Sequence, residues 1–181
     1  MLEITYAHLL IFITIVWIII RVVIGLKTKQ FSIKRELLLL LVYICIIVIS
    51  RFVYFELHTV NGKIVPLVID FPNDLSEAVS LRPFFFLVDR YDGWKINIIG
   101  NITMFIPVGI VWPVCFKKLD TLWKTVLAGA GYTLLIELSQ LMCVGRHSDV
   151  DDLILNTTGV LIGACIVFAI RSCFKKKTEV E

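Results

Sequence analysis

The chain has 181 residues, of which 58% are hydrophobic, and its mean hydropathy is +0.88. Soluble domains of this length are usually about 45–50% apolar, so the excess excludes an ordinary soluble domain and indicates a protein covered by lipid. The net charge of +3 is small and scattered, which argues against a nucleic-acid partner. The five cysteines form no CxxC pair and have no spaced His partner, so we interpret them as apolar packing residues.

Five segments are long and apolar enough to be membrane spans. A helix needs about 20 mainly apolar residues to cross the hydrocarbon core, and only helices that satisfy their own backbone can face lipid. The first segment lacks the basic region and cleavage site of a signal peptide, so we expect it to be retained. The predicted fold class is an all-α polytopic membrane protein with one membrane domain over residues 1–181. The expected spans are residues 7–26, 37–55, 96–116, 122–144 and 153–170.

The positions of the basic residues predict the orientation of these spans. Most Lys and Arg residues lie in three segments, residues 27–35, 117–124 and 171–177. These segments alternate with the spans, so all three fall on one side of the membrane. The positive-inside rule makes that side cytoplasmic. Most acidic residues fall on the other side, and we therefore expect an N-out, C-in protein.

The long connection over residues 56–95 is expected to be extracytoplasmic and partly helical. Asn73 can cap a short helix whose apolar positions include Val79 and Leu81. The following segment, residues 81–88, is too short to span the membrane and too aromatic to lie free in water. We interpret the connection as a lid or interfacial segment against the outer leaflet, the alternative being an ordinary loop packed over the helix ends.

The third expected span carries polar residues on one face. Asn97 and Asn101 are four residues apart, and Phe105 and Gly109 continue that face. Pro107 removes one backbone hydrogen bond, so a kink or an opened carbonyl is expected there. The asparagines either form the hydrogen-bonding edge of a cavity or join helices together.

The fourth expected span carries Glu137 within an apolar run, with Gln140 on the same side. A carboxylate at this depth must be protonated, paired with a cation or solvated. Arg51 and Arg146 are the available cations. Glu137 is therefore either a structural ion-pair partner or part of a functional site.

The densest polar stretch leads into the fifth expected span. Asp149, Asp152, Asn156, Gly159 and Gly163 recur at intervals of three and four, which places them on one helical stripe. Carboxylates at a helix start satisfy free backbone donors, so capping explains part of the acidity. It does not explain why the amide of Asn156 continues the stripe into the membrane. The glycines suit a close helix contact, either within the chain or between two copies in a homodimer.

Enzyme-like interpretations of this stretch have weaker support. The aspartates and His147 are suitable ligands for Mg²⁺ or Mn²⁺, but no second acidic motif matches them, so we expect no metal and no cofactor. Arg146, His147 and Asp149 faintly resemble the site of phospho-histidine membrane phosphatases, whose spacing and upstream Ser-Gly-His motif are missing. Ser148 has no positioned base and no Gly-x-Ser-x-Gly frame.

These motifs together resemble those of VanZ-like membrane proteins. The first block runs from Asn-Ile-Ile-Gly-Asn to Pro-Val-Gly over residues 97–109, and the second is Glu-Leu-Ser-Gln at residues 137–140. The third begins with Gly-Arg and continues through Asp-Val-Asp-Asp-Leu-Ile-Leu-Asn-Thr-Thr-Gly within residues 145–159. A Leu-Arg-Pro-Phe element at residues 81–84 precedes them. The blocks define a VanZ-like core over residues 81–169.

The resemblance implies a multi-pass protein of the bacterial cytoplasmic (inner) membrane. The family's named member is associated with low-level resistance to glycopeptide antibiotics, particularly teicoplanin, and no settled biochemical activity comes with the family. The resemblance therefore implies a polar site of unspecified chemistry. Its expected residues are Asn97, Asn101, Glu137, Gln140, Arg146, Asp149, Asp152 and Asn156.

Three functions are compatible with these observations. The first is a protein that binds or remodels membrane lipids or a lipid-linked cell-wall precursor at the outer leaflet, with Arg146 at a lipid phosphate. The second is an intramembrane enzyme in which Glu137 is the general base. The third is a small flippase or transporter in which Glu137 and Arg51 relay charge. In each case we expect the polar sets to meet near the outer surface, around the third, fourth and fifth spans.

Overall fold

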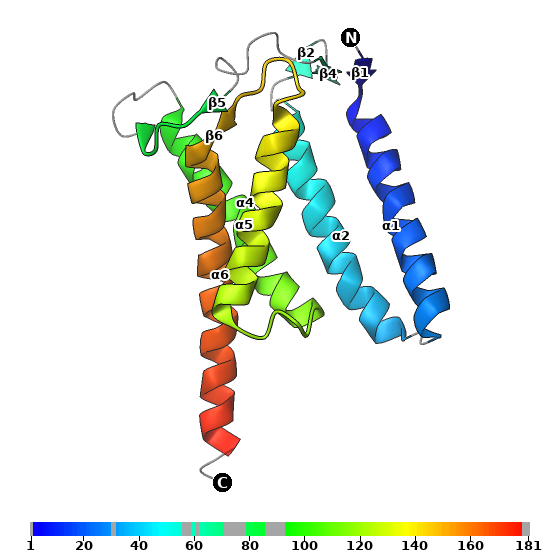
Figure 1. Cartoon of the computed structure of the whole chain (residues 1–181), viewed down its shortest axis with the longest axis vertical. Coiled ribbons are helices and arrows are strands. Elements are labelled where there is room, and N and C mark those ends of the chain that lie inside the picture. Colours follow the sequence, from blue (N-terminus) through cyan, green and yellow to red (C-terminus); the bar gives the residue numbers. More distant parts are fainter. Residues whose placement is uncertain are drawn as a thin grey trace.

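The computed structural model describes residues 2–29, 32–55, 59–60, 62–70, 79–85 and 93–178. Long helices dominate these residues and run alternately up and down (Figure 1). The all-α membrane class is confirmed, because four of these helices are long and apolar enough to cross a membrane. They are α1 (Tyr6–Thr28), α2 (Ile33–Tyr54), α4 (Trp94–Cys115) and α6 (Val150–Thr178). The fifth, α5 (Leu122–Gln140), carries Lys124 and Glu137 and falls outside that set, so its span stays a prediction.

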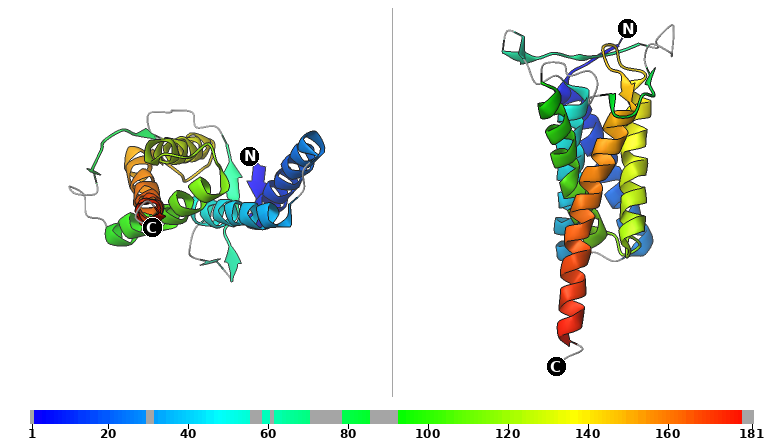
Figure 2. Two further views of the ribbon diagram at one scale, coloured as in Figure 1. Left: turned by 90° about the horizontal axis from the view of Figure 1, so that it is seen from below. Right: turned by 90° about the vertical axis from the view of Figure 1, so that its left-hand side faces the viewer.

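The helix α1 lies at the edge of the bundle and contacts α2. None of its residues is buried, and the view along the bundle shows it directed away from α4, α5 and α6 (Figure 2, left). Side-chain contacts join it to α2: the Thr14 hydroxyl lies 2.7 Å from that of Tyr43, and Arg21 forms an ion pair with Glu36. The ring centres of Trp17 and Tyr43 lie 5.6 Å apart. Polar pairs and aromatic contacts therefore attach this apolar helix to α2.

The core lies where α4, α5 and α6 meet. Phe105, Val108 and Val160 are fully buried there. A Cβ atom on Gly163 would lie 2.2 Å from the carbonyl oxygen of Ile106, and one on Gly159 would lie 2.2 Å from that of Ile102. These glycines therefore allow the backbones of α4 and α6 to touch.

The close glycine contact is thus made within one chain. It gives no support to a homodimer through this stripe. The helix α4 continues through Pro107, which has no N–H for the carbonyl of Thr103. The opened carbonyl that the sequence predicted is therefore accommodated without ending the helix.

Two helices end at positions that hydropathy did not predict. The helix α5 stops at Gln140, and residues 141–147 form turns with a positive φ of 74° at Gly145. The helix α6 begins at Val150 and extends beyond the expected span, through the basic residues Arg171 and Lys175. It projects below the other helices in Figure 1. Hydropathy reports the thickness of the membrane, whereas Lys and Arg are good helix formers that extend a helix into water.

Short strands cover the end of the bundle where α6 begins. The strand β1 (Leu2–Ile4) pairs antiparallel with β4 (Leu67–Ile69), and β2 (Thr59–Val60) pairs antiparallel with β3 (Lys63–Ile64). The strand β5 (Val79–Ser80) pairs in parallel with β6 (Ser148–Asp149). The connection between α2 and α4 is therefore attached both to the N-terminus and to the start of α6.

The prediction of a short helix from Asn73 onward is wrong for its last residues. Val79 and Ser80 are a strand, because pairing with β6 outweighs a weak local helix signal. The beginning of that expected helix, residues 71–78, lies outside the described residues. Of the expected interfacial segment, the structure describes Leu81 to Phe85, where Leu81 and Phe84 are exposed.

Candidate functional site

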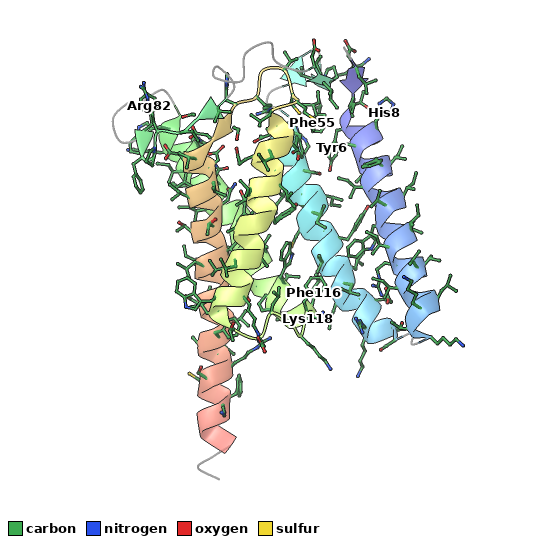
Figure 3. The ribbon with its side chains drawn as sticks, in the orientation of Figure 1. Tyr6, His8, Phe55, Arg82, Phe116 and Lys118 are labelled. Carbon is green, nitrogen blue, oxygen red and sulfur yellow. The ribbon has the colours of Figure 1, made fainter. Side chains whose placement is uncertain are left out.

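The three polar sets lie at one end of the bundle, which we call the acidic end. The start of α4, the end of α5 and the start of α6 meet there, beneath the short strands (Figure 1). Arg82 lies at this end, whereas Lys118 lies at the opposite end (Figure 3). The polar cluster, as we use the term below, consists of Asn97, Asn101, Glu137, Asp149, Asp151 and Asp152.

Glu137 has the smallest exposed surface of the carboxylates in the polar cluster. Its side chain is only 4% exposed, and its Oε2 atom accepts a hydrogen bond of 3.0 Å from the backbone N–H of Asp149. The Ser148 side chain is a second hydrogen-bonding neighbour. The segment that leads into α6 is thus attached to the last turns of α5. This contact joins the second polar set to the third.

The expected pairing of Glu137 with Arg51 or Arg146 is not found. Among the described residues no ion pair to Glu137 is present. Arg51 instead donates to the carbonyl oxygen of Phe55 over 3.1 Å, and its guanidinium lies 5.8 Å from the centre of the Tyr6 ring. The carboxylate of Glu137 is instead hydrogen-bonded by a backbone N–H and a hydroxyl group, whereas the sequence suggested a cation.

The start of α6 is built from hydrogen bonds between acids and backbone. The Oδ1 atom of Asp149 accepts from the N–H of Asp151 over 2.9 Å, and the Ser80 side chain also bonds this carboxylate. Burial raises the pKa of Asp149 above its usual range. Asp151 is itself buried and accepts from the backbone N–H of Phe84, whose φ is 61°. The acids therefore order the loop that covers the acidic end.

Sequence reasoning missed Asp151 as a member of the site. It lies off the stripe formed by Asp149 and Asp152, because residues two apart point to different sides of a helix. The signal was nevertheless present in the run Asp-Val-Asp-Asp, since three acids exceed what one helix cap requires.

Asn101 joins α4 to α6. Its Nδ2 atom donates to Oδ1 of Asp152 and also to Oδ1 of Asn97, the latter over 3.1 Å. One amide therefore connects the first polar set to the third, and the two asparagines four residues apart share a face as expected. The structure brings Asn97, Asn101, Glu137, Asp149 and Asp152 into one connected region.

The remaining three expected site residues lie apart from this region. Asn156 is buried deeper, where its Nδ2 atom donates 2.8 Å to the hydroxyl of Thr133 on α5. Gln140 donates 3.1 Å to the carbonyl oxygen of Val53 on α2. Both amides join helices, which is the structural role that the sequence left open.

Arg146 lies in the turns between α5 and β6 and is half-buried. In the described part of the chain its guanidinium makes no side-chain hydrogen bond or ion pair. A guanidinium in this state is available for an anionic ligand at the acidic end.

A groove between α2 and α4 adjoins the polar cluster. It has a volume of about 580 Å³ and is mostly apolar, with Val48 and Phe52 of α2 on one side. Asn97 and Asn101 line its other side. The two asparagines are thus both the edge of a cavity and a helix-joining group, because Asn101 also bonds Asp152. We call this feature the α2–α4 groove.

The polar cluster presents hydrogen-bond acceptors held in place by backbone donors. Carboxylate oxygens so fixed bind hydroxyl or amine groups of a ligand, and a buried carboxylate is also able to accept a proton. Within the described residues no group of three or more His, Cys, Asp or Glu side chains is arranged to hold a metal ion. The geometry therefore suits recognition of a polar group at the acidic end.

One comparison with known proteins gives a match. The family model described as VanZ/LLP1 matches residues 36–171, which is well over half of the chain. The match contains all eight expected site residues and extends across α2, beyond the core of residues 81–169 on which the resemblance rested. It leaves all of α1 outside. The comparisons with curated proteins and with solved structures give no match.

Proposed function

The chain belongs to the VanZ/LLP1 family, and we propose that it is a five-span, N-out, C-in protein of the bacterial inner membrane. In this proposal the protein binds or remodels an envelope lipid or a lipid-linked precursor at the outer leaflet. It thereby lowers the access of a lipophilic glycopeptide such as teicoplanin to its lipid-linked target.

The distribution of charge supports this orientation. The acidic end carries the polar cluster, and the opposite end carries Lys117, Lys118 and Arg171. The helix α5 has 19 residues, which at about 1.5 Å per residue gives about 28 Å. That length is close to the ~30 Å of a hydrocarbon core, so α5 is long enough to be the fourth span.

The polar cluster is the observation that carries the proposal. A carboxylate as deeply buried as Glu137, with no cation beside it in the described residues, is costly in a membrane protein and is retained for a role. Arg146, at the same end, supplies the complementary charge for a lipid phosphate. A lipid head group carries both kinds of partner, because it combines a phosphate with hydroxyl or amine donors.

The test is antibiotic susceptibility of a sensitive host. Empty vector, wild type, Glu137→Gln and Asp152→Asn are compared against teicoplanin and vancomycin at matched membrane levels. Asp120→Asn is the control, because it makes the same chemical change at an exposed site at the other end. We expect wild type and the control to protect against teicoplanin more than against vancomycin, and the two cluster variants to lose protection.

Three outcomes contradict the proposal. Equal protection by the cluster variants assigns Glu137 and Asp152 to structure alone. Equal protection against vancomycin, which lacks a lipid tail, removes the role of the lipophilic drug. No protection by wild type shows that the resistance role does not extend to this chain.

One observation favours a second function, an enzyme acting on a lipid-linked substrate. Glu137 accepts a hydrogen bond from the backbone N–H of Asp149 and lies beside the carboxylates of Asp149 and Asp152, an arrangement that suits a general base. Envelope lipids incubated with purified protein are expected to remain unchanged under the leading proposal. A new lipid species that depends on Glu137, detected by mass spectrometry, supports the enzyme instead.

A further inference from the structure

The α2–α4 groove has a shape set by small residues. Gly93, which precedes α4, and Gly100 of α4 line it together with Phe52 of α2, and neither glycine places a side chain in the groove. A Cβ atom on Gly100 would meet nothing within 4 Å, so the space beside it is open. The groove is therefore a hollow that a bound molecule is able to fill without moving the helices.

The depth of the groove matches one leaflet. From Gly93 to Met104, which both line it, α4 rises about 16 Å at 1.5 Å per residue. Half of a hydrocarbon core is about 15 Å. Because Gly93 precedes the first turn of α4 at the acidic end, the groove begins at the surface and ends near the membrane centre.

The polar edge of the groove is continuous with the polar cluster. Asn97 and Asn101 line the groove, and Asn101 also donates to the carboxylate of Asp152. A molecule that fills the groove therefore places its surface end against amides and acids, and its other end among apolar side chains. This combination describes an amphiphile aligned along the membrane normal.

We propose that the α2–α4 groove holds one acyl chain of a membrane glycerolipid, whose head group lies against the polar cluster. The inference rests on the orientation in the proposed function and names the class of lipid that the site takes. An acyl chain has the length of one leaflet, as the groove has. A polyprenyl chain is several times longer and leaves most of its length outside. Lateral opening to the bilayer also supplies glycerolipid at the concentration of the membrane itself.

Photo-crosslinking in vesicles tests the occupant. The purified full chain is reconstituted in phosphatidylglycerol vesicles that contain a small fraction of phosphatidylglycerol with a diazirine at the end of one acyl chain. After irradiation, labelled positions are read by peptide mass spectrometry. We expect Val48 and Met104 to be labelled several-fold more than Ile15 and Ile19, which are exposed on α1.

A matched pair of glycine variants controls for indirect effects. Gly100→Leu fills the groove, whereas Gly131→Leu adds the same side chain at an equally open position on α5. We expect groove labelling to fall several-fold in Gly100→Leu and to stay at the wild-type level in Gly131→Leu. Both variants are expected to keep the wild-type unfolding midpoint, because neither new Cβ atom meets an obstacle.

Two results overturn the inference. Labelling of the groove that equals labelling of α1, or that survives Gly100→Leu, shows that bulk lipid passes over an empty surface. Competition by polyprenyl phosphate at a lower amount than unlabelled phosphatidylglycerol assigns the groove to an isoprenoid lipid.

The failures of the two proposals are distinguishable. If the groove is not labelled but Glu137→Gln removes protection against teicoplanin, only the acyl-chain assignment fails. If the groove is labelled as expected but both cluster variants protect like wild type, the proposed function fails.

Discussion

The first helix and the last three helices of this chain differ in how much of their surface packs against the rest of the protein. The helix α1 has the highest mean hydropathy of the candidate spans, 2.9, and none of that span is buried within the protein. The helix α4 has the lowest, 1.8, and carries Phe105 and Val108 in the core. Lipid is as apolar as leucine, so hydrophobicity holds a helix in the membrane without attaching it to its neighbours. Small and polar residues provide the attachment.

The two regions are consequently joined by different contacts. Close contacts between backbones at glycines hold α4 against α6. A Cβ atom on Gly109 would lie only 2.1 Å from the carbonyl oxygen of Val160. Separate side-chain contacts hold α1 against α2, including the ion pair of Arg21 with Glu36 and the ring contact of Trp17 with Tyr43. We expect substitutions in the first region to disturb the whole fold and those in the second to disturb α1 alone.

The largest effect is expected from Gly163→Leu. Its Cβ atom would lie 2.2 Å from the backbone oxygen of Ile106, so α4 and α6 must separate. Overpacking of this kind costs about 1–3 kcal/mol or more, and a loss of folded protein is expected. The check is the thermal unfolding midpoint in detergent, with Gly131→Leu as the control at an open position. A wild-type midpoint for Gly163→Leu contradicts close packing of α4 on α6.

A smaller effect is expected from Thr133→Val in the same region. It removes the hydroxyl that accepts from Nδ2 of Asn156 and leaves a buried donor unpaired. Interhelical hydrogen bonds in membranes contribute about 0.6 kcal/mol on average and up to about 1.7 kcal/mol. A double-mutant cycle with Asn156→Leu measures the coupling in the free energy of unfolding. If the effects of the two substitutions are strictly additive, the hydrogen bond between Asn156 and Thr133 does not stabilise the fold.

Arg21→Met is expected to act locally and more weakly. The ion pair with Glu36 is only partly buried, and pairs near water contribute about 0–1 kcal/mol. Hydrogen exchange read by mass spectrometry should show faster exchange in α1 and unchanged protection in α4, α5 and α6. Loss of protection throughout the bundle removes the distinction between the two regions.

The smallest effect concerns the pH dependence of Asp149. Burial raises its pKa in the folded state, so folding favours the protonated acid. The free energy of unfolding therefore falls as pH rises from the ordinary aspartate pKa of about 3.9 to the raised value, and the penalty is complete above it. Asp149→Asn should reduce this slope while keeping an acceptor for the N–H of Asp151. Parallel pH profiles for variant and wild type contradict the prediction.

Much of the helical architecture was readable from the sequence. Apolar runs placed every long helix of the described residues, because the thickness of a membrane fixes the number of apolar residues that a span needs. Of the predicted stripe, Asp152, Gly159 and Gly163 lie on the face of α6 that meets α4. Asn156, on the same predicted stripe, instead contacts Thr133 of α5. Spacing along one helix predicts which residues share a face, and that information is local.

The partners of the polar residues were not readable in the same way. Glu137 bonds a backbone N–H of Asp149, and a backbone donor has no signature in the sequence. The sequence suggested Arg51 as a partner of Glu137 because of its charge alone. In the structure the guanidinium of Arg51 lies beside the Tyr6 ring. The strand at Val79 depends on pairing with β6 across a long separation, and local propensity does not report it. Contacts between distant segments therefore required the structure.

The strand β4 has a consequence for the biogenesis of the chain. One edge of β4 pairs with β1 at the N-terminus, and its other edge meets the turns after α5, where Val144 donates to Val68 and Asp70 to Met142. A chain that enters the membrane from its N-terminus has both β1 and β4 in place well before residue 144 is synthesised. The acidic end is therefore able to close only after the whole of α5 has been synthesised.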